Sequence, residues 1–175
     1  KAFNYSEEVV CAWASKVVGR PIKWTADRSE AFLTDAHGRD QLAQAELYLD
    51  GDKKITGLKV SITANMGAYL STFGSLIPTY MCVPLLSGQY VIPAIYAEVK
   101  GVYTNTSPVD AYRGAGRPEA AFIIERLIDL AARKTGTSPV DLRRKNFIKK
   151  FPYQTPVLST YDCGDYEKAL STALE

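Results

Sequence analysis

The stretch DAYRGAGRPEA, residues 110–120, places two glycines, two arginines and a proline just ahead of a long apolar run. Glycine lets backbone come close to another group, and the exposed N–H groups at a helix start attract negative charge. Arginine adds a planar cation that binds oxyanions through parallel hydrogen bonds. The pattern therefore fits a site for an anionic or oxyanionic group, held by the helix start and by Arg113 or Arg117.

Two other interpretations of this loop stay open on the residues alone. Glycines serve any helix-entry turn with strained backbone angles, and the arginines would then be solvated or paired with Asp110 and Glu119. A dinucleotide-binding loop is the weaker alternative, because the spacing is G-x-G-x-x-A. The residues TSPVDAYR also separate it from the preceding strand, where that motif requires a tight strand-to-helix turn.

The elements that must position the loop are helices and strands in mixed order. Apolar periodicity with start and stop signals predicts helices over residues 6–18, 118–136, 138–148 and 165–175. Gly136 is the predicted stop of the second helix, and Ser138 is the predicted cap of the third. Alternation of apolar and polar residues predicts strands over residues 22–28, 42–50, 54–63 and 94–104, with the middle two forming an antiparallel hairpin. Strands in hairpins mixed with helices indicate an α+β fold, with a mixed or antiparallel sheet and helices packed on one side.

Several side chains are expected to build the core around these elements. In the helix over 118–136 the predicted apolar face consists of Phe122, Ile124, Leu127, Ile128 and Ala131. Trp13 and Trp24 are expected to pack the first helix against the sheet. Residues 65–93 are predicted to form an ordered, partly buried connection. Its aromatic residues Tyr69, Phe73 and Tyr80 are expected in the core, and the lining of a substrate funnel is the alternative.

Charged residues are scattered, with a formal net charge of +2, so no basic stripe indicates a nucleic-acid partner. The basic run RRKNFIKK is expected to be a solvated helix end. The apolar stretches are interrupted before the roughly 18 residues that a membrane span requires.

The three cysteines, Cys11, Cys82 and Cys163, lie far apart, which argues against a disulfide framework and a cysteine metal site. His37 is the one histidine, so no His/Cys cluster can hold zinc. We expect no protein ligand to a metal and a reducing, cytoplasmic compartment. The opening Lys1 and a final helical pattern suggest a piece of a longer polypeptide.

Three motifs in order carry a family resemblance: GRPIKWTADRSEAFLTDAHGRD, ANMGAYLSTFGS and TNTSPVDAYRGAGRPEAAFIIERLIDLAARKTGTSPVDLRRKNFI. They resemble the large, molybdopterin-binding subunits of the xanthine dehydrogenase, aldehyde oxidoreductase and carbon monoxide dehydrogenase family, especially its carbon monoxide dehydrogenase-like branch. The resemblance implies that residues 1–175 are part of a molybdenum cofactor-binding domain. The sheet region would span about 20–104, the cofactor-site loop 110–118 and a helical region 118–175.

In that family the large subunit binds molybdenum through a pterin dithiolene, usually as the cytosine dinucleotide in bacteria, and hydroxylates a carbon with oxygen from water. Electrons leave through iron–sulfur and FAD groups on partner subunits or domains. The resemblance therefore implies oxidation of an aldehyde or heterocycle by a parent enzyme that is oligomeric. The family's catalytic glutamate lies beyond Glu175, so these residues alone are expected to be inactive. A noncatalytic scaffold that keeps the fold is the alternative.

Carried over by motif, Arg113 positions substrate and supports charge in the transition state, and Arg113, Gly114, Ala115 and Gly116 contact the cofactor. Gly114 stands where copper-containing carbon monoxide dehydrogenases have a cysteine, which implies no copper site. Ala115 stands where purine hydroxylases have a stacking phenylalanine. His37 falls near a substrate-binding arginine of those enzymes and is a weaker candidate.

The first two residues can be compared with the family in the same way. Lys1 resembles the last residue of a glycine-rich segment of the family, and Ala2 replaces the glutamate that follows it in purine hydroxylases. The departure at Ala2, like the one at Ala115, counts against a purine substrate.

Overall fold

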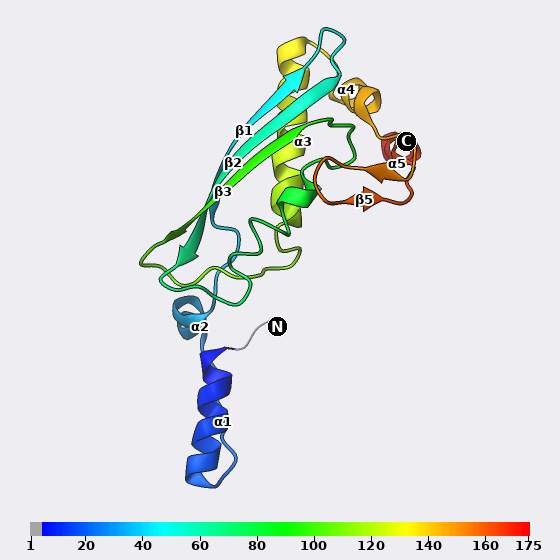
Figure 1. Cartoon of the computed structure of the whole chain (residues 1–175). Helices are drawn as coiled ribbons and strands as arrows, with labels where there is room; N and C mark the ends of the chain where they lie inside the picture. Colours follow the sequence, from blue (N-terminus) through cyan, green and yellow to red (C-terminus); the bar gives the residue numbers. More distant parts are fainter. Residues whose placement is uncertain (1–4) are drawn as a thin grey trace.

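The computed structural model describes residues 5–175, and the expectations for Lys1 and Ala2 lie outside the described residues. It places a sheet of order β1-β2-β3 against a long helix, α3, with α1 and α2 at one end (Figure 1). A small pair of strands, β4 (Tyr153–Gln154) and β5 (Thr160–Tyr161), lies at the opposite end with α4 and α5. The arrangement confirms an α+β fold.

The central sheet is mixed. β1 (Gln41–Leu49) and β2 (Ile55–Gly67) form the predicted antiparallel hairpin, in which Ala45 faces Val60. In the turn between them, the Asp50 carboxylate accepts hydrogen bonds from the N–H groups of Asp52 at 2.9 Å and Lys54 at 2.8 Å. β3 (Ile95–Tyr103) pairs with β2 in parallel, so the connection between these strands must return to the opposite end of the sheet.

The core lies between the sheet and α3 (Arg117–Thr135), which ends at the predicted stop, Gly136. The apolar side chains of β2 pack with Ile124 and Ile128, all buried. Phe122 was wrongly predicted to share this face, because it is 70% exposed. A residue two positions from Ile124 lies about 200° around a helix from it, so both cannot face one sheet.

Residues 68–94, which connect β2 to β3, are ordered around a short 3₁₀ helix, η1 (Val83–Leu85). The prediction of a partly buried connection is confirmed by its fully buried side chains, Cys82, Leu86, Tyr90 and Ile92. The core assignment of its other aromatic residues was wrong for Tyr69 and Tyr80, which are 60% and 69% exposed, whereas Phe73 is half-buried.

α4 (Pro139–Asn146) begins as predicted, with the Ser138 hydroxyl accepting from the N–H of Val140 at 3.2 Å. The run RRKNFIKK is not fully solvated, which corrects the expectation for Arg143. That guanidinium donates to the Glu125 carboxylate at 2.7 and 3.0 Å and to Asp129 at 3.0 Å. α5 (Tyr166–Leu174) follows the turn-rich segment that holds β4 and β5.

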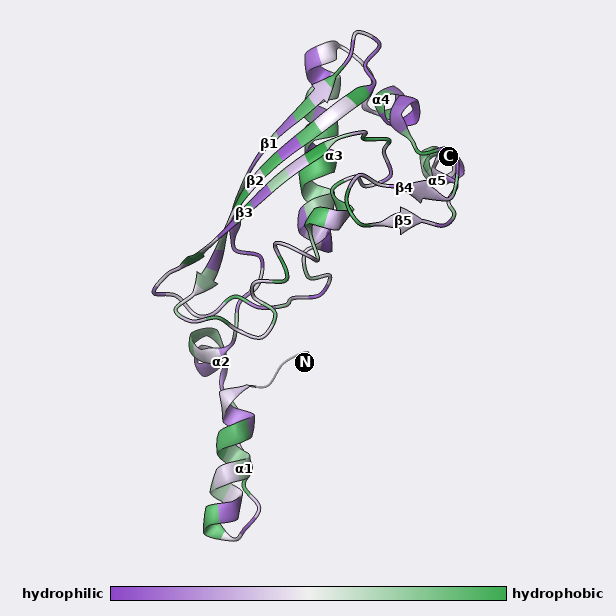
Figure 2. Cartoon of the chain, viewed as in Figure 1, coloured by the Kyte–Doolittle hydropathy of each residue, from purple (hydrophilic) through white to green (hydrophobic). Residues whose placement is uncertain are grey.

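The N-terminal part contradicts two expectations. α1 (Ser6–Val18) projects away from the sheet and buries none of its residues (Figure 1). Trp13 and Trp24, at 64% and 45% exposed, therefore do not pack a helix on the sheet. Residues 22–28 form no strand, because no neighbouring strand pairs with them, and α2 (Arg28–Thr34) begins at a cap on Asp27. Hydrophobic residues on α1 are left uncovered (Figure 2).

Within residues 5–175, no helix is both long enough and apolar enough to cross a membrane.

Candidate functional site

The loop that enters α3 has an unusual backbone. Gly114, Ala115 and Gly116 have positive φ angles of 98°, 40° and 90°. The turn is closed by the Ala115 N–H, which donates to the Tyr112 carbonyl at 2.8 Å, and by the Arg117 N–H, which donates to the Gly114 carbonyl at 3.1 Å. This left-handed conformation is favourable for glycine and costs other residues about 1–2 kcal/mol.

The glycines also allow close packing within the chain. A Cβ at Gly116 would lie 2.5 Å from the Ile77 carbonyl oxygen, and one at Gly114 would lie 2.6 Å from Cγ of Pro118. The interpretation of these glycines as a structural helix-entry turn therefore holds for their conformation. The same interpretation expects the arginines of the loop to be solvated or paired with Asp110 and Glu119.

Arg113 and Arg117 are both exposed, and neither forms an ion pair with Asp110 or Glu119. Within the described residues the Arg113 side chain has no hydrogen-bond or ion-pair partner. The Arg117 guanidinium makes one weak contact, to the Gly114 carbonyl at 3.4 Å. The N–H groups of Gly114 and Gly116 likewise find no acceptor in residues 5–175. The loop thus leaves the Arg113 guanidinium and the Gly114 N–H without a partner in the described residues, whereas Gly116 is buried.

Asp110 fixes the start of the loop. Its carboxylate is buried and accepts hydrogen bonds from the Ser71 hydroxyl, from the Phe73 N–H at 3.3 Å and from the Ala111 N–H at 2.5 Å. A buried carboxylate that is satisfied by donors on a separate segment holds the two backbones in one arrangement. The loop is therefore tied to the 68–94 connection and not only to α3.

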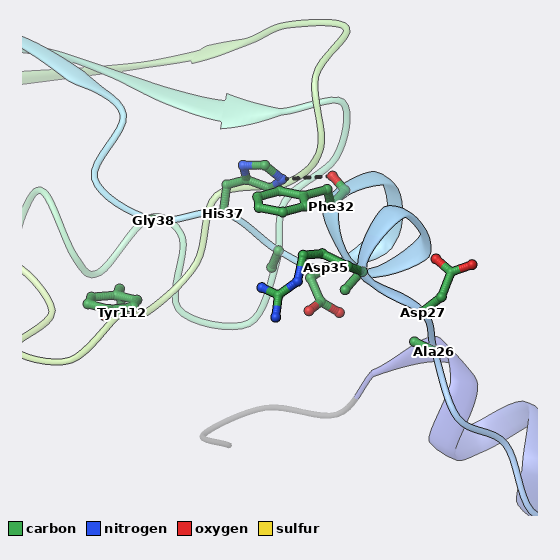
Figure 3. A pocket seen from close by; sticks show the side chains of 10 residues that line it. Ala26, Asp27, Phe32, Asp35, His37, Gly38 and Tyr112 are labelled. Atoms are coloured by element: carbon green, nitrogen blue, oxygen red, sulfur yellow. Dashed lines mark hydrogen bonds between the residues drawn. The ribbon is translucent and has the colours of Figure 1, made fainter.

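His37 lies beside this loop. Its N–H donates to the Pro108 carbonyl at 3.0 Å, and its carbonyl accepts from the Asp110 N–H at 2.8 Å. The imidazole Nε2 lies 3.3 Å from the Phe32 carbonyl oxygen. His37 and Tyr112 line an open cavity of about 520 Å³ together with residues of α2 and the segment that follows it (Figure 3). His37 and the loop residue Tyr112 therefore line the same cavity.

Arg39 is a residue of this site that the sequence did not indicate. Its guanidinium donates to the Arg113 carbonyl, lies over the Tyr112 ring at 4.5 Å from the centroid and approaches the Glu119 carboxylate at 3.8 Å. No spacing rule relates Arg39 to Arg113, which follows it by 74 residues. A long-range contact of this kind has no local sequence signal.

Cys82 packs under the same loop, and its thiol is not a reactive group. Burial, with a further contribution from the Glu119 carboxylate, raises the pKa of Cys82 to about 12. The thiol is therefore protonated at neutral pH and behaves as a small apolar side chain.

The donors at this site suit an anion and not a bare metal ion. In the part of the chain that the structure describes, no three His, Cys, Asp or Glu side chains gather where they could hold a metal. An organic cofactor that carries its own metal ligands needs only N–H groups and cations from the protein. The loop satisfies that chemical requirement.

The chain matches the molybdopterin cofactor-binding domain over residues 1–147, and it belongs to that family. It is 42% identical to the carbon monoxide dehydrogenase large chain of Hydrogenophaga pseudoflava, over 95% of this chain and 21% of that one. It is 38% identical to the 6-hydroxypseudooxynicotine dehydrogenase complex subunit gamma of Paenarthrobacter nicotinovorans, over 98% of this chain and 22% of that one. The family resemblance expected from the motifs is confirmed.

Solved structures agree with the fold. Quinoline 2-oxidoreductase from Pseudomonas putida 86 superposes with a TM-score of 0.89 and 32% identity, over 95% of this chain and 22% of that one. A Cu,Mo carbon monoxide dehydrogenase superposes with a TM-score of 0.87 and 35% identity, over 98% of this chain and 22% of that one. The chain thus spans about a fifth of the length of these relatives.

Proposed function

We propose that these residues are one part of the large subunit of a molybdenum hydroxylase that oxidises an aldehyde or a heterocycle, with water as the source of oxygen. The observation that carries the proposal is the exposed, unpaired Arg113 on a rigidly anchored turn in a member of the molybdopterin cofactor-binding family. An arginine paired with Asp110 or Glu119 would have left no cation of the loop free for a ligand. The relatives that are named as dehydrogenases or oxidoreductases support the same reaction class.

We propose that residues 113–116 hold the pterin cofactor, in the cytosine dinucleotide form. The bound cofactor supplies the molybdenum redox chemistry of the reaction. The Gly114 N–H, which has no acceptor in the described residues, is the backbone donor that the loop offers to an anionic group. Arg113 offers a fixed cation to an oxygen of substrate that gains negative charge in the transition state.

The substrate is proposed to be an aldehyde or an N-heterocycle and not carbon monoxide or a purine. Gly114 has no thiol to bind copper, and Ala115 has no ring on which a purine stacks. The cavity beside His37 and Tyr112, about 520 Å³, lies in the range of about 300–1,000 Å³ that small-molecule sites occupy. We assign His37 a supporting role at the wall of this cavity.

The remainder of the large subunit and iron–sulfur and flavin partners are proposed to complete the enzyme, which we expect to be oligomeric and cytoplasmic. No glutamate in residues 5–175 is assigned as the catalytic base, since the family's motif for it lies beyond Glu175. Residues 1–175 by themselves should therefore show no turnover.

The decisive test is the molybdenum content of the full-length polypeptide, purified from a host that makes the pterin cofactor and measured by elemental mass spectrometry. Near-stoichiometric metal and turnover of aldehydes or N-heterocycles are expected. In the same protein, Arg113→Ala should keep the melting temperature and most of the metal, because the backbone of residues 114–116 still holds the cofactor, but lower kcat/KM by about 10²–10³. Arg126→Ala, at an exposed arginine of α3, is the matched control and should leave all three unchanged.

A noncatalytic scaffold is the second candidate, because internal packing alone accounts for Gly114 and Gly116. A well-folded full-length protein that carries no molybdenum in a cofactor-competent host would favour the scaffold over the hydroxylase.

A further inference from the structure

We propose that Arg39 is a positioning residue that holds the Tyr112–Gly116 backbone in place, with buried Glu119 as its counterion. The inference rests on the proposed function, because the loop matters to the reaction only if it faces cofactor and substrate. It assigns to the site a residue from the segment between α2 and β1, far from the loop in sequence.

The Arg39 guanidinium contacts the loop at two residues and the first turn of α3 at a third. It donates to the Arg113 carbonyl, stacks on Tyr112 at 4.5 Å and pairs with Glu119 in the first turn of α3 at 3.8 Å. It also lies against Gly114, where a Cβ would be 3.6 Å from Nη2. The contacts before, within and after the turn constrain both ends of the residues whose N–H groups are free.

The Arg39 backbone is itself held on both sides. His37 is bonded to Pro108 and Asp110, and the Asp40 carbonyl accepts from the Asn65 N–H at 3.0 Å. The Asn65 side chain also donates to the Asp40 carboxylate at 2.7 Å. Arg39 adopts a φ of 59°, a left-handed conformation that is uncommon for a side chain of this size. This backbone aims the guanidinium at the loop, and the surrounding bonds maintain it.

The charge of buried Glu119 explains why the Arg39 guanidinium stays at the loop. The residue is 9% exposed, and its Oε2 atom has no hydrogen-bond partner in the described residues. A buried carboxylate requires a cation, and within these residues Arg39 is the one that pairs with it. Its place in the first turn of α3 adds the favourable field of the helix N-terminus. Glu119 therefore keeps the guanidinium at the loop.

Lysine cannot replace this arginine. An ammonium is a single point charge without the planar fork, so it cannot stack on Tyr112 while it bonds to a carbonyl and a carboxylate. Arg39→Lys consequently separates the role of the charge from the role of the geometry. Arg39→Ala removes both, and Arg126→Lys, at an exposed arginine of α3, is the matched control.

The first test is hydrogen exchange in the full-length subunit. The Ala115 and Arg117 amides, which close the turn, should exchange about tenfold faster or more in both Arg39 variants, because a charged hydrogen bond is lost. Amides of β2 should be unchanged, which shows that the variants fold. Unchanged exchange at Ala115 and Arg117 would overturn the proposal whether or not the protein contains molybdenum.

The second test is steady-state kinetics of the molybdenum-loaded enzyme. Arg39→Lys should lower kcat more than it changes KM, since a displaced loop impairs transition-state contacts more than substrate capture. Methylguanidinium should partly restore kcat of Arg39→Ala. Faster loop exchange with a normal kcat would make Arg39 merely structural and refute its positioning role. A wild-type protein without molybdenum would instead refute the proposed function, and hydrogen exchange would still decide whether Arg39 holds the loop.

Discussion

The buried Asp110 carboxylate accepts a hydrogen bond from the hydroxyl of Ser71, which joins the start of the site loop to the connection between β2 and β3. The two residues are separated by 39 positions, yet one oxygen of Asp110 also accepts from the Phe73 N–H at 3.3 Å. The geometry of the loop therefore depends on a segment that lies far from it in the sequence.

We predict that Asp110→Asn lowers the free energy of unfolding by about 1–3 kcal/mol, because the amide cannot accept from all the donors that the carboxylate satisfies. Urea denaturation of the full-length protein measures the effect. Asp162→Asn is the control, since Asp162 makes the same local bond to the next N–H at 2.8 Å but is exposed. Equal effects of both substitutions would contradict the anchoring role of Asp110.

We predict that Gly116→Ala is more harmful than Gly19→Ala. Both glycines have positive φ, 90° and 68°, so both substitutions carry the conformational cost of about 1 kcal/mol. Only at Gly116 would the new Cβ meet other backbone, 2.5 Å from the Ile77 carbonyl, whereas nothing lies within 4 Å at Gly19. Thermal unfolding should show a clearly larger loss for Gly116→Ala, and the opposite order would show that the loop can move away from residues 77–82.

Cys82 should resist alkylation in the folded protein. Its burial and a pKa of about 12 leave almost no thiolate at pH 8. Mass spectrometry after iodoacetamide treatment should find Cys82 unmodified in the native protein and modified in guanidinium chloride. Rapid native labelling would contradict the buried position.

The Cys82 thiol also predicts how the free energy of unfolding changes with pH. The pKa of Cys82 is raised on folding. The contribution of the protonated thiol to the free energy of unfolding is therefore complete below the unfolded pKa of 9.0 and decreases as pH rises toward about 12. Urea midpoints between pH 8 and 10 should fall more steeply for wild type than for Cys82→Ala. Identical slopes would show that the thiol ionises freely in the folded state.

Arg143→Lys should destabilise the packing of α4 on α3 by about 1–2 kcal/mol, because a lysine cannot reproduce the paired bonds to Glu125. The Tyr90 hydroxyl donates to the same carboxylate at 2.7 Å, so the change would also disturb a buried aromatic residue. Urea denaturation with Arg133→Lys, an exposed arginine of α3, provides the comparison. A null effect would show that the network is solvated in solution.

Local chemistry in the sequence determined much of the fold. Ser138 caps α4 and Gly136 ends α3 as predicted, because caps and left-handed stops act within a few residues. The alternation along β1 and β2 predicted their hairpin because side-chain direction in a strand has a period of two. The loop at residues 110–118 was predictable for the same reason, because its glycines and proline reflect local backbone angles.

Only the tertiary structure decided which side chains meet. Trp13 and Phe122 are large apolar residues of the kind found in protein cores, but both are exposed. Burial depends on a partner surface and not on the residue itself. Arg39 and Glu119 lie in different motifs, and only the folded chain brings Nε of Arg39 within 3.8 Å of the Glu119 carboxylate. The sequence by itself thus determined where a charged, glycine-rich turn stands, and long-range packing decided which arginine holds that turn and which one is left free.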